Sequence, residues 1–220
     1  MALSPESFVA ELDAQNQEAL ARIAIASSSG EPGEAVTVPR LLLLALKNEL
    51  EATECAAAWI PTTPEVNVKL ALARQAGDEA KHYRMIQARL AELDVDTKNH
   101  DPLAAGKSPL LTWLVALEGT VARVAAGQFT REALAVVRNA EFVRFCRATG
   151  DAETARLYEE TIQPDERHHH DLGRKLLLEL ATTDETQSAA REASRKVLSM
   201  AEELQEIARL KAGITRAPGC

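Results

Sequence analysis

The segment PDERHHHDLG, residues 164–173, places three consecutive histidines in a stretch whose composition is typical of a helix. A helix advances by about 100° per residue, so residues three apart lie on nearly the same face. His169 therefore lies about 60° from Glu166, on the apolar face of this segment. His168 points to the opposite side, and His170 lies about 40° from Glu166 in the other direction, close enough to share the same centre.

A second segment, GDEAKHYRMI at residues 77–86, repeats this spacing. Glu79 shares its face with apolar residues one and two turns away in both directions, and His82 lies about 60° from Glu79 on that face. Each segment therefore turns one carboxylate and one imidazole towards the core.

A lone glutamate, Glu49, lies in the middle of the apolar stripe of an expected helix at residues 39–60, whereas Glu51 and Glu54 lie on the far side. An unpaired buried carboxylate is costly or changes its pKa. Glu49 therefore needs a counter-charge inside the protein.

The fourth carboxylate is expected from residues 108–148, which contain three candidates: Glu118, Glu132 and Glu141. Glu141 is rotated off the apolar stripe that the other two share. In a hairpin that turns near residue 150, Glu132 lies at the level of Glu166, whereas Glu118 lies about 20 Å away at 1.5 Å per residue. We therefore select Glu132.

The composition predicts an all-α protein. The 220 residues are 46% hydrophobic with only 10 Gly and 9 Pro, and good helix formers dominate. We expect one domain covering residues 1–220, with helices at about 4–27, 39–60, 64–93, 108–148, 151–181 and 184–212. Gly119 and Gly127 are expected to bend or interrupt the fourth helix, and Pro164 to cause a kink or a π-type bulge in the fifth.

The connections predict how the helices are arranged. Residues 27–39 are expected to form a loop. The connection at residues 94–109 can span about 50 Å, the length of a long helix, so it can return along the bundle. We therefore expect a four-helix bundle with one long crossover at about residues 39–181, with the first and last helices outside it.

Charge and cysteine content exclude several classes. A net charge of −8 disfavours a general nucleic-acid-binding surface. Cys55, Cys146 and Cys220 form no metal or disulfide pattern, and the N-terminal region resembles no signal peptide, so we expect a cytoplasmic protein. The apolar run at residues 41–46 is too short to span a membrane.

Four buried carboxylates cannot coexist without cations. Two divalent metal ions balance them, and one Glu from each of two helices plus Glu-x-x-His from each of two others is a ligand set for two iron or manganese ions. The mixture of carboxylate and imidazole without thiolate favours these metals over structural zinc. The expected ligands are Glu49, Glu79, His82, Glu132, Glu166 and His169.

The motifs DEAKH (78–82) and DERHH (165–169), each preceded by an inward glutamate about 30 residues earlier, resemble those of the ferritin-like di-iron carboxylate superfamily. The resemblance covers about residues 39–181 and is better for stand-alone di-iron oxygenases and oxidases than for storage ferritins, bacterioferritins or rubrerythrins. It implies two Fe ions, with Mn as the alternative, that react with O2 and oxidise a small organic substrate. It leaves the substrate unnamed.

Two other functions compete with this interpretation: an iron- or peroxide-handling protein of ferroxidase or catalase type, and a metal-free helical interaction module. The expected partners are O2, a small-molecule substrate, an electron donor and a second copy of the chain in a homodimer. Tyr83 and Tyr158 lie near the expected site face, so each is either a core residue or a catalytic residue with a redox or hydrogen-bonding role.

Overall fold

The computed structural model describes residues 1–28 and 36–219, and within them all regular secondary structure is helical, which confirms the all-α class. Residues 29–35, most of the expected loop at 27–39, lie outside the described residues, as does Cys220. The helical segments are α1 (Pro5–Ser28), α2 (Val38–Trp59), α3 (Val66–Glu92), α4 (Pro109–Val115), α5 (Thr120–Val124), η1 (Ala125–Arg131), α6 (Glu132–Ala148), α7 (Ala152–Leu157), η2 (Tyr158–Ile162), α8 (Gln163–Leu180) and α9 (Asp184–Ala212).

Several helices begin where the sequence places a capping residue. The side chains of Thr37, Ser108, Asp151 and Thr183 each accept a hydrogen bond from a backbone N–H in the first turn of α2, α4, α7 and α9 respectively. Such a cap satisfies a donor that has no partner within the helix. These four helices therefore begin within one or two residues of the positions expected from the sequence.

The interruption expected at Gly119 in the helical stretch at residues 108–148 is confirmed. α4 ends at Val115, and Gly119, with φ of 80°, precedes α5 at Thr120. A left-handed φ is rare for residues with a side chain but open to glycine, so the chain turns here and a new helix begins. At Gly127 the helix does not break. This residue lies in the π-helical segment η1, and the chain stays helical from Thr120 to Ala148.

Two π-helical segments, η1 and η2, lie directly before α6 and α8. The second ends just before Pro164, as expected for a proline that lacks a backbone donor. The first packs very closely on α8, because a Cβ atom added at Gly173 would lie 2.7 Å from the backbone carbon of Gln128 and the backbone nitrogen of Phe129. Glycine at this position lets the two backbones approach each other.

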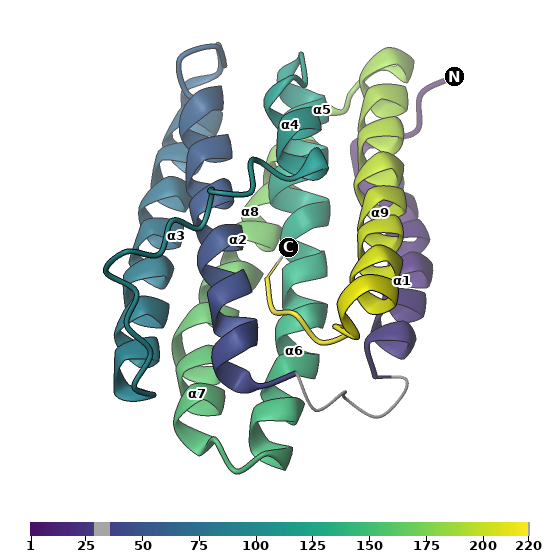
Figure 1. Cartoon of the computed structure of the whole chain (residues 1–220). Helices are drawn as coiled ribbons and strands as arrows, with labels where there is room; N and C mark the ends of the chain where they lie inside the picture. Colours follow the sequence, from purple (N-terminus) through teal and green to yellow (C-terminus); the bar gives the residue numbers. More distant parts are fainter. Residues whose placement is uncertain (29–35, 220) are drawn as a thin grey trace.

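The helices form two antiparallel pairs joined by a long connection (Figure 1). α2 and α3 form the first pair, and α5–η1–α6 with α7–η2–α8 form the second. The connection after α3 returns along α2, where Lys47 Nζ donates a hydrogen bond to the Gly106 carbonyl at 2.5 Å. Because of this crossover, the second pair starts at the end of the molecule where α3 begins. α1 and α9 pack against the second pair.

The crossover buries Glu51, which the helical pattern places away from the bundle interior. Glu51 is 5% exposed because its two carboxylate oxygens accept hydrogen bonds from the backbone N–H and the hydroxyl of Ser108, at 2.7 and 2.5 Å. Lys47 Nζ lies 2.9 Å from the same carboxylate. The charge of Glu51 is therefore paired on the outer side of α2.

Two apolar clusters fill the interior of the helix pairs, one at each end. The first contains Trp59, Phe129 and Leu177, and the second contains Leu42 and Phe142. Between them lies a layer of buried carboxylates and imidazoles. This layer is shielded from water on both sides. No helix among the described residues is long and apolar enough to cross a membrane.

Candidate metal centre

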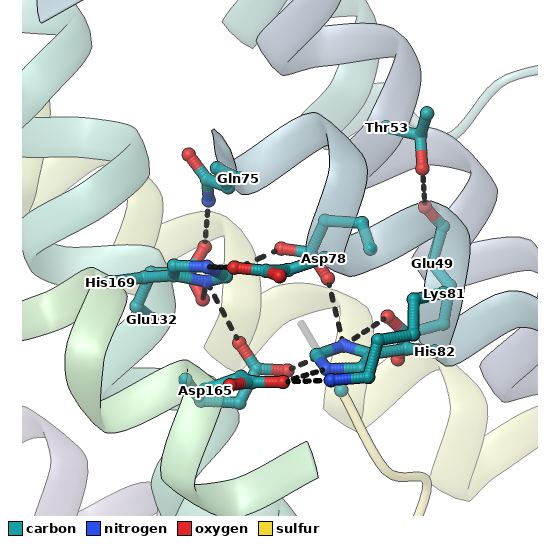
Figure 2. Close-up of polar contacts among 12 residues, drawn as sticks. Glu49, Thr53, Gln75, Asp78, Lys81, His82, Glu132, Asp165 and His169 are labelled. Atoms are coloured by element: carbon teal, nitrogen blue, oxygen red, sulfur yellow. Dashed lines mark hydrogen bonds and ion pairs between the residues drawn. The ribbon is translucent and has the colours of Figure 1, made fainter. Parts of the chain in front are cut away.

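The structure brings all six expected ligands together in this polar layer (Figure 2). All are at most 3% exposed. They form two groups, in each of which one ligand atom per residue lies within 4.8 Å of the others. The groups are Glu49, Glu79, His82 and Glu166, and Glu79, Glu132, Glu166 and His169. Because Glu79 and Glu166 belong to both groups, the two groups adjoin and can share carboxylates.

The first group is arranged around the Nδ1 atom of His82. This atom lies 3.3 Å from Glu79 Oε2, 3.4 Å from Glu49 Oε2 and 4.0 Å from Glu166 Oε1. These residues come from α2, α3 and α8, so no single helix builds the group.

The second group is arranged in the same way around the Nδ1 atom of His169. This atom lies 3.6 Å from Glu132 Oε2, and 3.8 Å from both Glu79 Oε1 and Glu166 Oε2. Each shared carboxylate thus directs one oxygen to each imidazole. The two groups are therefore similar four-residue sites.

Four buried ligand atoms have no hydrogen-bond partner among the described residues: His82 Nδ1, His169 Nδ1, Glu132 Oε2 and Glu166 Oε2. A buried polar atom without a partner costs about 1–3 kcal/mol, and more when it is charged. These atoms belong to the ligand sets of the two groups. A metal ion in each group would supply the missing partner, so the residues present fit a dinuclear centre.

The pKa values show that burying the charges of this layer is unfavourable without cations. Burial, opposed in part by the adjacent imidazole of His82, raises the pKa of Glu79 to about 7. Burial also raises the pKa of Glu166 well above its ordinary value, followed by the charges of Glu79 and Glu132. For Glu132, burial is outweighed by the adjacent side chains of Glu166 and His169, which lower its pKa to about 2.

The pKa values of both imidazoles are also raised, against the effect of burial. Burial favours neutral His82, but the adjacent carboxylates of Glu49 and Glu79 outweigh it and raise its pKa to about 12. In the same way, Glu132 outweighs the burial of His169 and raises its pKa to about 9. Without metal, protons on these groups therefore balance the carboxylates. Divalent ions would displace those protons, because a ligating imidazole is neutral.

The outer nitrogens of the two histidines are held by two aspartates that sequence reasoning missed. His82 Nε2 lies 3.1 Å from Asp165 Oδ2, and His169 Nε2 lies 3.1 Å from Asp78 Oδ2. A carboxylate accepts these bonds, so each Nε2 carries a hydrogen, and in the neutral imidazole that a metal ion requires each Nδ1 is left as the acceptor facing the interior. The signal for them is the Asp directly before the Glu in both motifs.

The two aspartates bind across the helix pairs, each holding the histidine of the opposite motif. Lys81 Nζ lies 2.9 Å from Asp165 Oδ2, and Arg74 Nε lies 3.3 Å from Asp78 Oδ2. Burial raises the pKa of Asp165, but hydrogen bonds from Lys81 and His82 outweigh burial and lower it. Asp165 therefore stays ionised and keeps its bond to the imidazole.

Gln75 is a further residue that sequence reasoning missed. Its Nε2 donates a hydrogen bond to Glu132 Oε1 at 2.5 Å, across from α3 to α6. This bond occupies one oxygen of Glu132 and leaves Oε2 for the interior. Gln75 lies one turn before Glu79 on the same helix face, which is the signal for it.

The two tyrosines differ in their relation to the site. Tyr158 is 0% exposed, and its hydroxyl has no hydrogen-bond partner among the described residues. Burial, followed by the charge of Glu49, raises its pKa well above the ordinary value, and its ring meets Phe142 edge to face at 4.9 Å. Tyr83 is half-buried beside the second apolar cluster. Within the described residues no hydrogen bond joins Tyr83 to a ligand.

The remaining candidates lie outside both groups. His170 Nδ1 lies 2.6 Å from the Phe129 carbonyl, and its ring stacks on that of Phe129 at 4.8 Å. His170 therefore anchors η1 to α8. His168 is half-buried, and burial lowers its pKa. Glu118 is exposed in the turn before α5. Of the three histidines, His169 alone belongs to a ligand group.

Comparison with known proteins identifies no relative: no family model, no curated protein and no solved structure matches this chain.

Proposed function

We propose that this protein is a dinuclear iron or manganese oxidoreductase of the ferritin-like di-iron carboxylate type, which activates O2 to oxidise a small organic substrate. One observation carries the proposal: two buried four-residue groups share Glu79 and Glu166. This is the arrangement expected when two cations lie side by side and carboxylates serve both.

The ligand roles follow from the two groups. Glu49 and His82 would complete one metal site, Glu132 and His169 the other, and Glu79 and Glu166 would serve both. Oxygen and nitrogen donors without thiolate suit iron or manganese. When bound as iron(II), the two ions supply electrons to O2.

The protein itself supplies position, dryness and proton control. The apolar clusters on both sides of the layer exclude water from the centre. Asp78 and Asp165 keep each Nδ1 directed to the interior. The buried hydroxyl of Tyr158 holds a proton close to the charges of Glu49 and Glu166. Tyr158 is therefore the better of the two tyrosines as a catalytic candidate.

The electron balance of the reaction requires an outside partner. The reduction of O2 to water takes four electrons, of which two bound iron(II) ions and a two-electron oxidation of the substrate would supply two each. The oxidised centre then needs two electrons from a donor before the next turnover. We therefore propose a small-molecule substrate and an electron donor as partners. The proposed assembly is a homodimer, which the electron balance does not concern.

The test begins with metal binding. Purified protein is loaded anaerobically with iron(II) or manganese(II), and metal per chain and O2 uptake are measured. The proposal requires saturation at two ions per chain and O2 uptake that depends on them. Iron accumulation far above two ions per chain would favour a ferroxidase, and hydrogen peroxide removal without O2 uptake a catalase.

A variant with Glu79→Ala and Glu166→Ala together provides the control, because it removes both shared ligands. It should bind neither ion and consume no O2 beyond the rate of free iron. If the unchanged protein binds no metal specifically, or if this variant binds both ions as well as the unchanged protein does, the metal-free interaction module becomes the better explanation.

A further inference from the structure

A cavity of about 190 Å³ lies on the outer side of α2, away from the metal centre. α4, α9 and the non-helical residues 214–217 form its other walls. None of the six ligands lines it, and every residue in its wall is buried or half-buried. The cavity is therefore separate from the metal centre and mostly surrounded by protein.

Most of the cavity wall is apolar, and branched aliphatic side chains from three helices and from the C-terminal segment line the same space. They are Leu44, Leu110, Leu111, Leu114, Leu204 and Ile214. Protein interiors are close-packed, and voids larger than a water molecule are few. An apolar protein cavity of about 150 Å³ stays dry and holds benzene. A cavity of the present size among leucines therefore favours an apolar occupant over water.

The charged groups in the cavity wall already have partners inside the protein. The carboxylate of Glu51 is paired with Lys47. Arg138 Nη2 donates a hydrogen bond to the Ala201 carbonyl at 3.2 Å, and Arg131 is likewise engaged within the protein. Burying an ion is costly unless it gains a partner of opposite charge. The described wall residues offer a charged molecule no unpaired counter-charge, so the cavity favours an uncharged one.

The C-terminal segment closes one side of the cavity. Asn48 Nδ2 donates a hydrogen bond to the Pro218 carbonyl at 2.8 Å, and the Gly219 N–H donates one to Asn139 Oδ1 at 2.7 Å, so the segment is tied to both α2 and α6. Figure 1 shows it running from the end of α9 towards these two helices. Terminal residues are usually poorly ordered unless they are tied down. Here the two bonds hold residues 214–217 in place as one wall of the cavity.

We propose that this cavity binds an uncharged apolar molecule of about six to eight carbon atoms, such as a small aromatic hydrocarbon. The size of the molecule follows from the comparison with the cavity that holds benzene. Its lack of charge follows from the aliphatic wall and from the partners that the charged wall residues already have. Because no metal ligand lines the cavity, this proposal does not depend on the dinuclear centre.

Calorimetric titration of the full chain with toluene tests the proposal, with benzoate and benzylammonium as charged probes of the same carbon skeleton. We expect one toluene per chain and at least about tenfold weaker binding of both charged probes, because each would bring an unpaired ion into the cavity. Toluene should also raise the unfolding temperature, since it binds the folded chain. Absence of saturable toluene binding, or equally tight binding of either charged probe, would overturn the proposal.

A variant with a filled cavity locates the binding. Ala208→Phe places a ring in the cavity and should abolish both the heat of toluene binding and the rise in unfolding temperature. Ala91→Phe, the same substitution at an exposed position on α3, should leave both unchanged. If Ala208→Phe does not fold, Thr215→Phe fills the cavity from the C-terminal segment. Unchanged toluene binding in the filled variant would show that toluene binds elsewhere, and the proposal would then be wrong.

Discussion

Replacing Glu79 by glutamine should make the stability of the metal-free protein less sensitive to pH. Glu79 is 2% exposed, and its pKa is raised from 4.5 to about 7, chiefly by burial. Its folded-state pKa thus lies above the unfolded value. Folding is not penalised below pH 4.5, where the carboxyl is protonated in both states. The penalty develops as pH rises from 4.5 to 7 and is complete above pH 7.

The size of the effect follows from the folded and unfolded pKa values of Glu79. A pKa that differs by one between the two states corresponds to about 1.4 kcal/mol, so the full penalty is about 3 kcal/mol. Part of it is already present at pH 5, and the change between pH 5 and pH 8 is about 2–3 kcal/mol. Glutamine has no such titration. The difference in unfolding free energy between Glu79→Gln and the unchanged protein should therefore change by about 2–3 kcal/mol in favour of the variant over this range.

Urea unfolding in the presence of a chelator, at pH 5 and at pH 8, measures this difference. Comparing two pH values cancels the constant cost of packing an amide in place of a carboxyl group. Glu179→Gln, the same substitution at an exposed position on α8, serves as the control and should change by less than about 0.5 kcal/mol.

The same variant should lose stability in relation to the unchanged protein once iron(II) or manganese(II) is added, since only the unchanged protein gains from metal binding. The reasoning is refuted if the difference between the two metal-free proteins stays constant from pH 5 to pH 8. It is also refuted if the difference changes in favour of the unchanged protein.

The remaining predictions concern stoichiometry, affinity and packing. Glu49→Ala should retain one metal ion per chain and Glu166→Ala none, because Glu49 serves one group and Glu166 both; metal analysis after anaerobic loading checks this, and equal stoichiometry in the two variants would contradict it. Asp165→Ala should lower metal affinity about 10- to 100-fold without changing the number of sites, because the aspartate orients the His82 ring; competition with a chelating dye measures it, and unchanged affinity would argue against this role. Gly173→Ala should destabilise the protein by more than about 2 kcal/mol, because its Cβ would lie 2.7 Å from backbone atoms. Gly77→Ala, a helical glycine with nothing within 4 Å, should stabilise it by about 0.5–1 kcal/mol; thermal unfolding of the two variants should show these opposite signs.

Sequence reasoning identified the six side chains that the structure brings together, and the reason is geometric. The direction of a helical side chain and its height along the axis both follow from residue number alone. For this reason Glu132 could be selected as a ligand in preference to Glu118, which is exposed in the structure. The same local rules located Pro164 as the cause of an irregular segment, now seen as η2.

The same reasoning failed where an interaction joins parts of the chain that are distant in sequence. It did not indicate that Glu51, on the outer side of α2, is buried, because the crossover that covers Glu51 has no periodicity. It also gave no reason to expect that the C-terminal segment would cross α2 and α6.

From the sequence alone, the helical class, the inward direction of each acid and imidazole, and their common level could be derived, because each is a property of one helix or of chain length. The tertiary structure decided which helices face each other. Only that arrangement pairs Asp78 with His169 and Asp165 with His82, and lets Gln75 donate a hydrogen bond to Glu132. Contacts of this kind depend on how close two helices lie and in which rotation they pack, and side chains from distant parts of the chain set both.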